Sequence, residues 1–322
     1  MKKNLILSIV LLVFATTVSA QSLNEAGELF NTANEQFKSK NFNGALKSYQ
    51  NALSIANQLG EDGKDLAGKI EKMIPTTKVN YGKELIQNKN IDEALKYLLE
   101  AVDDAEKLGE TKIANSSKSL ISNVYVSQAG SAFGQKNWEE TIKLSDLAIK
   151  YNVATPKAYL FNALSYSELN NEDKMVESIT KAVSYGNAKN DEKTVNSAKQ
   201  VGTTYFNNQA QELIAKNKFN EAIDALNKSI SIDGGIETTW YLKASCFNKL
   251  NKSDEAIEAG LMGLETESDS KDIRNGINLE LARAYEAKGD KDNACKYYSQ
   301  AATSATFKEE ATHKMTEVLK CN

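Results

Sequence analysis

A 13-residue motif that occurs seven times constrains the fold of this chain more than any other feature of its sequence. The first copy is residues 41–53 and the second is residues 90–102. The seven copies are centred on Ala45, Ala94, Thr141, Met175, Ala222, Ala256 and Ala294. Internal repeats with periods of 20–50 residues are typical of arrays in which each unit packs against the next. The sequence therefore predicts an array of seven similar units.

Three further positions carry the same kind of residue in all seven copies. Twelve residues before the centre stand Ala33, Gly82, Ala129, Ala163, Ala210, Ala244 and Ala282, and seven residues after it stand Ala52, Ala101, Ala148, Ala182, Ser229, Gly263 and Ala301. Directly after the centre come Leu46, Leu95, Ile142, Val176, Ile223, Ile257 and Cys295. Small residues are needed where two helices cross, because a large side chain would push the axes beyond about 8–10 Å. The pattern predicts a pair of antiparallel helices for each copy.

A short polar turn separates the two predicted helices of each pair. In five copies it ends with an amide or carboxylate residue, namely Asn41, Asn90, Asn137, Asn171 and Asp290. These residue types cap helix N-termini, each contributing about 1 kcal/mol. Lys218 and Lys252 stand there in the other two copies, where we expect weaker caps. The chain has only two prolines, as a run of helices requires.

The motif resembles the tetratricopeptide-repeat family. The resemblance is carried by Trp240, Ala244, Phe247 and Ala256, and again by Leu281, Ala282, Tyr285, Gly289, Asp290, Ala294, Tyr298 and Ala301. It covers about residues 23–304. It implies an all-α fold, a right-handed α-solenoid of about seven helix pairs. It is specific for fold and says little about the ligand.

The spacing of the centres departs from the 34 residues of that family. Successive centres are separated by 49, 47, 34, 47, 34 and 38 residues, so three steps carry extra chain. Shared between two antiparallel helices, this surplus predicts about two additional turns in each. Pro156 should open a helix after Thr155. Pro75 falls inside a lengthened helix, which it should kink or break.

The first 20 residues have the order of a cleavable export signal. Lys2 and Lys3 precede an apolar run from Leu5 to Phe14, which small residues follow up to Ala20. The run is too short to span a bilayer, which takes about 20 apolar residues. We expect cleavage after Ala20, no lipid anchor, no transmembrane segment in the mature chain, and a periplasmic or extracellular protein. The predicted parts are a signal peptide (1–20), the solenoid (21–304) and a C-terminal capping helix (305–322).

Few residues of the sequence could serve in catalysis, phosphate binding or metal binding. The chain has one histidine, His313, and no glycine-rich phosphate loop or spaced metal-ligand set. The formal net charge is −4, without the basic stripe that nucleic acid binding requires. The sequence therefore predicts a protein that is not an enzyme, has no catalytic residue, holds no cofactor and no metal, and does not bind nucleic acid. It does not predict the oligomeric state.

The three cysteines leave alternatives open. Cys295 occupies an apolar core position of its repeat, so it either packs there as a thiol or pairs with Cys321. If the terminal helix folds back on the last repeat, the two residues differ by roughly 6 Å of helix rise, against a Cα separation limit of about 7 Å. Cys246 would then remain a single buried thiol.

The resemblance also implies where a partner would bind. In this family the first helices of successive repeats line a concave groove that takes an extended peptide or a partner helix. By position, the groove would present Phe30, Asn34, Val79, Lys83, Val126, Leu160, Leu164, Asn207, Gln211, Tyr241, Ser245 and Arg283. Alternatively, several of these, especially Val79, Val126 and Leu160, only pack between neighbouring helices. The lysine–asparagine set that clamps a C-terminal carboxylate in some family members is absent here.

Three functions remain in competition. The first is a protein-interaction scaffold of the cell envelope that binds peptides or other proteins. The second is a glycan-binding surface protein, although the only tryptophans, Trp138 and Trp240, stand at framework positions. The third is an enzyme with an unrecognised site, which the missing nucleophile–base sets disfavour.

Overall fold

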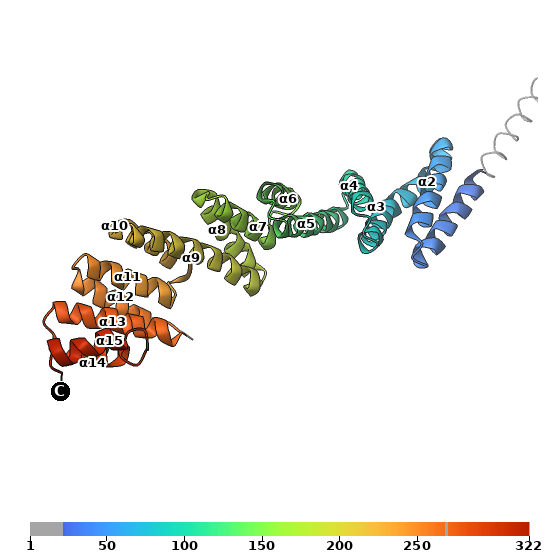
Figure 1. The fold of residues 1–322 in the computed structure, drawn as a ribbon. Helices are drawn as coiled ribbons and strands as arrows, with labels where there is room; N and C mark the ends of the chain where they lie inside the picture. Colours follow the sequence, from blue (N-terminus) through green and yellow to red (C-terminus); the bar gives the residue numbers. More distant parts are fainter. Residues whose placement is uncertain (1–21, 268–269, 322) are drawn as a thin grey trace, which may run out of the picture. The chain divides into compact units, whose positions relative to one another are not determined.

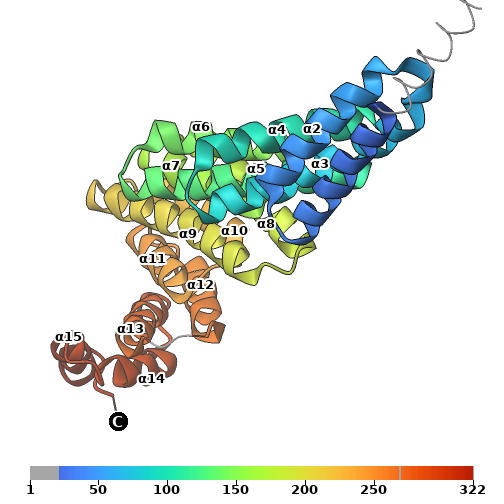
Figure 2. The same ribbon diagram turned by 90° about the vertical axis from the view of Figure 1, so that its right-hand side faces the viewer.

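The computed structural model describes residues 22–267 and 270–321, and in these ranges the chain is helical without any strand. The predicted signal peptide lies outside the described residues. The chain divides into two units, Met1–Ser131 with Lys143–Ala154 and Ala132–Ile142 with Thr155–Asn322. Each is an array of consecutive helices (Figures 1 and 2). The predicted all-α class is confirmed, because the helices follow one another as packed pairs.

The first unit begins with a helix over residues 22–38. The elements that follow are α2 (Phe42–Gln58), a short 3₁₀ turn η1 (Gly60–Asp62), α3 (Lys64–Gln87) and α4 (Ile91–Lys107). Most of α5 (Thr111–Gly134) and the second half of α6 (Trp138–Tyr151) also belong to this unit. Its core includes Tyr49, Ile70, Leu98 and Ile121, which are fully buried.

The second unit contains four complete helix pairs. They are α7 (Pro156–Glu168) with α8 (Glu172–Ala188), α9 (Glu192–Ala215) with α10 (Phe219–Asp233), α11 (Glu237–Lys249) with α12 (Ser253–Glu265), and α13 (Lys271–Ala287) with α14 (Lys291–Ala301). The chain then turns into α15 (Lys308–His313) and a π-helical turn η2 (Lys314–Val318). The two helices of each pair lie side by side.

Every predicted crossing position is buried. These are the positions twelve residues before the centre, at the centre and seven residues after it. Their alanines are all 0% exposed, and so are Thr141, Met175 and Ser229. The two glycines, Gly82 and Gly263, are buried as well. At Gly82 a methyl group would come within 2.8 Å of Leu98 Cγ on α4. The two helices of this pair are therefore as close as their side chains permit, which is the reason for small residues at these positions.

All seven pairs share one turn geometry between their helices. A residue with positive φ stands before the cap position, and the next backbone N–H donates to the carbonyl five residues earlier. In the first pair Lys40 has φ of 62° and Asn41 N–H donates to Gln36 O at 2.8 Å. The last pair has Gly289 at φ of 76°, with Asp290 N–H donating to Tyr285 O. This bonding satisfies a carbonyl that the end of the first helix would leave without a partner.

Four of the five predicted side-chain caps are present. Asn41, Asn137, Asn171 and Asp290 each accept a bond from the backbone N–H three residues later. The prediction for Asn90 is wrong, because its amide nitrogen donates to Glu93 Oε2 at 2.6 Å instead. Lys218 and Lys252 make no side-chain cap, as predicted.

The lengthened helices are present, but their extra turns are unevenly shared. The first helices α3, α5 and α9 each have 24 residues, against 13 in α7 and α11. The preceding second helices α2, α4 and α8 have 17 residues each. Pro156 opens α7, as predicted. The predicted break at Pro75 does not occur, since α3 continues from Lys64 to Gln87 around it.

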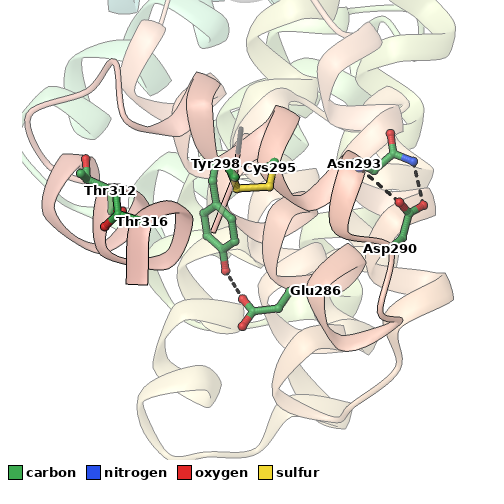
Figure 3. Close-up of a disulfide and its surroundings, with 8 residues drawn as sticks. Glu286, Asp290, Asn293, Cys295, Tyr298, Thr312 and Thr316 are labelled. Carbon is green, nitrogen blue, oxygen red and sulfur yellow. Dashed lines mark hydrogen bonds between the residues drawn. A yellow bond between two sulfur atoms is a disulfide. The ribbon is translucent and has the colours of Figure 1, made fainter. Parts of the chain in front are cut away.

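The C-terminal segment folds back on the last helix pair. Ala311 is fully buried, and Phe307, Met315 and Leu319 pack against the cluster that contains Leu281 and Tyr298. Lys314 forms a 2.7 Å ion pair with Glu286. Glu286 also accepts a hydrogen bond from the Tyr298 hydroxyl (Figure 3). A disulfide joins Cys295 of α14 to Cys321, with a Cα separation of 5.8 Å. Of the two alternatives for Cys295, the structure has the disulfide.

Candidate functional site

The second unit has an open groove of about 840 Å³ between α7 and α9. These are the first helices of two successive pairs, and they contact each other directly. The side chains along α7 are Leu160, Leu164, Ser167 and Glu168, followed by Asn170 in the turn. The side chains along α9 are Ser197, Gln200, Val201, Thr204, Tyr205, Asn208, Gln209 and Glu212.

Buried residues on the opposite face of α9 determine which side chains reach the groove. Phe206 is 1% exposed, and Ala198 and Ala210 are fully buried. Gly202 lies so close to the neighbouring helices that a methyl group there would come within 2.9 Å of Ile179 on α8. Since this face of α9 is packed, the face with Val201, Tyr205 and Asn208 is turned away from the core.

The groove combines apolar and polar surface. Leu160, Leu164, Val201 and the ring of Tyr205 supply the apolar part. Amide groups, hydroxyls and two carboxylates, Glu168 and Glu212, supply the rest, and no basic side chain is among the lining residues. Burial raises the pKa of Tyr205, Glu172 raises it further and Lys228 opposes them. The Tyr205 hydroxyl is therefore a neutral hydrogen-bonding group at physiological pH.

Two of the twelve predicted partner-binding residues line this groove. Leu160 and Leu164 lie on the face of α7 that looks towards α9. Of the predicted pair on α9, Gln211 is exposed but outside the groove. Asn207 is 5% exposed, and its amide donates to Thr239 Oγ1 of α11 at 3.0 Å. Asn207 is therefore part of the packing between two helices and does not lie on a binding surface.

In each of these repeats, the predicted residues lie on the face of the first helix that packs against the first helix of the next repeat. This explains why only some of them line the groove. The face of α7 with Leu160 looks towards α9, and the corresponding face of α9 with Asn207 looks towards α11. On α11 the corresponding Tyr241 lies against α13, so closely that a methyl group on Gly276 would meet its ring at 2.9 Å. A groove between two helices is lined by different faces of each helix. Carrying one repeat position along the chain can therefore identify only one wall.

The other predicted residues of the second unit lie near the C-terminal segment or between helices. Ser245 on α11 is half-buried. Arg283 on α13 donates to Glu280 at 2.9 Å and to both carboxylate oxygens of Glu310. It therefore anchors the C-terminal segment in this structure. It also lines a smaller hollow of about 180 Å³ with Asn248 and the buried Glu280.

The first unit contains the remaining five predicted residues. Phe30 packs against Tyr49, with ring centroids 5.9 Å apart, and Asn34 accepts a 2.6 Å hydrogen bond from the Tyr49 hydroxyl. Val79 is 6% exposed and belongs to the interior, so the alternative of helix packing holds for it. Val126 is half-buried, and of these five residues only Lys83 is exposed.

Sequence reasoning missed the whole α9 wall of the groove. Val201, Tyr205, Asn208 and Glu212 recur at intervals of three or four residues along the lengthened helix α9. Such spacing places side chains on one helix face. That signal was present in the sequence, but it does not say which neighbouring helix the face meets.

The described residues show no further site of a familiar kind. Cys246 is 1% exposed, and burial, with the nearby Glu280 carboxylate, raises the pKa of its thiol to about 12. This thiol is a poor nucleophile at neutral pH. In residues 22–267 and 270–321 no three histidine, cysteine or acidic side chains are grouped so that they could hold a metal ion. Across the same ranges, no helix combines the length and the hydropathy needed to span a bilayer.

A family model for the tetratricopeptide repeat matches residues 203–235 and 276–305. The first match covers the end of α9 and α10, and the second covers most of α13 and α14. Both therefore coincide with helix pairs of the array. The chain is a tetratricopeptide-repeat protein. The five other helix pairs repeat the same small-residue positions and turn bonding.

Several solved tetratricopeptide-repeat structures are similar to this chain. The TPR2AB domain of yeast Sti1, in the structure titled "TPR2AB-domain:pHSP90-complex of yeast Sti1", is 15% identical, with 91% of this chain and 95% of that chain covered and a TM-score of 0.41. The P58(IPK) TPR domain is also 15% identical, with 92% and 98% covered and a TM-score of 0.33. YrrB, a TPR protein with an unusual peptide-binding site, is 14% identical, with 60% and 91% covered and a TM-score of 0.34. The family assignment rests on the family model and the helix pairs, because these scores are all low.

No curated protein matches the chain. Tetratricopeptide-repeat proteins as a class are protein-interaction scaffolds.

Proposed function

We propose that this protein is an interaction scaffold of the cell envelope and that it binds peptides or partner-protein segments in the groove between α7 and α9. The observation that carries the proposal is the lining of this groove. Four apolar side chains lie among amide and hydroxyl groups along two adjacent helices, and the groove is open to solvent.

This lining suits an extended peptide for a physical reason. An extended segment presents side chains that gain free energy by leaving water, and a backbone whose N–H and C=O groups need partners. Leu160, Leu164 and Val201 offer the apolar contact. Gln200 and Gln209 each carry an amide that can both donate and accept.

The structural role of both tryptophans does not favour the glycan-binding alternative. Trp240 is 8% exposed, and Trp138 packs against Phe133 with ring centroids 5.2 Å apart. The Trp240 indole is therefore not an open platform for a sugar ring, and the Trp138 indole is half-buried.

Two observations support a location outside the cytoplasm. Residues 1–20 have the order of an export signal. The Cys295–Cys321 disulfide suits an oxidising compartment, because cytosolic reductants keep most thiols reduced.

If the chain is exported, the mature protein should begin at Gln21 and should be recovered from the periplasmic or extracellular fraction. Mass spectrometry of the purified protein measures its N-terminus directly. A protein that retains Lys2 and Lys3 and stays in the cytoplasmic fraction would contradict the proposed location. This result would not contradict the proposed binding of peptides in the groove.

Replacing Leu164 by aspartate is expected to weaken peptide binding by about 10-fold or more, because a charge would replace an apolar contact in the groove. The ligand is a peptide selected by the purified mature protein from a random phage-displayed library. Fluorescence anisotropy with that peptide measures the dissociation constant.

The matched control is Leu261→Asp on α12. Leu261 is 39% exposed and does not line the groove, so its replacement should change the dissociation constant less than 2-fold. Equal losses in the two variants, or no selected peptide at all, would overturn the proposed function.

A further inference from the structure

Two unpaired carboxylates stand at one end of the groove between α7 and α9. Glu168 is the last residue of α7, and Glu212 lies in the last turn of α9. Both line the groove. Within residues 22–267 and 270–321, neither carboxylate has a basic side chain within ion-pair distance.

Two other acidic residues of the same region form ion pairs with lysines. Glu172 of α8 forms a 2.6 Å ion pair with Lys228, and Asp233 of α10 forms a 2.7 Å ion pair with Lys199. The Lys199 side chain thus belongs to an ion pair outside the groove, although Lys199 is on α9.

The backbone adds to the negative potential at this end. The last carbonyl groups of a helix carry a partial negative charge, equivalent to about half an elementary charge. Acidic side chains are unfavourable in the last turn for this reason, and basic ones are preferred there. Glu168 and Glu212 therefore do not stabilise α7 and α9 by their positions, but they make the end of the groove attractive to a cation.

The apolar part of the groove lies one helical turn away. Leu164 and Glu168 are four residues apart on α7, which is about 6 Å along the helix and on one face. An extended peptide rises about 3.3 Å per residue, so this distance corresponds to about two peptide residues.

We propose that the groove selects extended peptides in which an apolar residue and a lysine or arginine are about two residues apart. The apolar side chain lies against Leu164 and Tyr205, and the basic group lies between Glu168 and Glu212. This specificity rests on the proposed peptide-binding function, and it names the class of partner that the site takes.

The test compares a selected peptide with its Lys→Gln or Arg→Gln version in a double-mutant cycle. With the wild-type protein at low salt, the substituted peptide should bind about 10-fold more weakly, as the loss of two exposed ion pairs predicts. With Glu168→Gln/Glu212→Gln, the two peptides should bind within 2-fold of each other. Raising the salt concentration should weaken wild-type binding and should leave the double variant nearly unaffected.

A control variant carries the same change of net charge elsewhere. Asp224→Asn/Glu255→Gln alters two exposed acidic residues of α10 and α12 that do not line the groove. It should behave as wild type towards both peptides. Circular dichroism of all variants checks that the helices remain.

The outcomes separate this inference from the function on which it rests. If the wild-type protein selects no peptide, the proposed function fails. If it selects peptides without enrichment of lysine or arginine, or if Glu168→Gln/Glu212→Gln retains the full preference for the basic peptide, peptide binding stands and the cationic specificity is overturned. Selection of acidic peptides would also overturn it.

Discussion

Replacing Ala210 by leucine is expected to lower the free energy of unfolding of the second unit by about 3 kcal/mol. Ala210 is fully buried where α9 meets α10, in a cluster with Ala222 and Leu226. Three additional carbon atoms at this crossing would force the helices apart or displace their neighbours. Because each repeat contacts mainly its neighbours, the loss should be concentrated in α9 and α10.

Urea unfolding followed by circular dichroism measures the change, and hydrogen exchange of α9 and α10 locates it. The control is Ala188→Leu at the exposed end of α8, which makes the same substitution and should change stability by less than about 0.5 kcal/mol. A similar result for the two variants would contradict the role assigned to the small residues.

Removing the Cys295–Cys321 disulfide is expected to destabilise the C-terminal end of the array by about 3 kcal/mol. The bond closes a loop with a sequence separation of 26, and its loss would give the unfolded segment more conformational freedom. Hydrogen exchange of residues 308–321 in Cys295→Ser/Cys321→Ser should therefore become faster. The packing of Ala311 and the ion pair of Arg283 with Glu310 should keep the segment partly attached.

A reductant provides the matched comparison for this bond. Dithiothreitol should bring the wild-type protein to the stability of Cys295→Ser/Cys321→Ser and should not affect that variant. Cys246 does not interfere, because it is buried and forms no disulfide. If the reductant and the substitutions leave the exchange of residues 308–321 unchanged, the disulfide does not hold this segment.

The predicted helix pairs agree with the structure because their determinants are local. The small residues at Ala33, Ala45 and Ala52 act between two helices joined by a short turn, and the same relation recurs in every pair. Helix capping also depends on local sequence. Among the five amide and carboxylate caps, the prediction was wrong only at Asn90, whose side-chain amide donates to the neighbouring Glu93 carboxylate.

The distribution of the extra turns was not predictable from repeat spacing. The spacing gives only the total number of residues between two centres. The same total allows many different lengths for α8 and α9. The position of the turn between them decides the division. In the structure Asp191 caps α9 by accepting a bond from Thr194 N–H, and this leaves 24 residues for α9.

The sequence by itself determined the all-helical class, the seven helix pairs and the family, because a periodic pattern of small residues specifies contacts between neighbours in the chain. Only the tertiary structure decided which side chains form the groove. Leu164 and Tyr205 are separated by a whole helix, α8, and by two turns. Whether both line one groove depends on how α7 and α9 are rotated about their axes. The packing of the opposite helix faces sets that rotation, and the repeat pattern does not specify this packing.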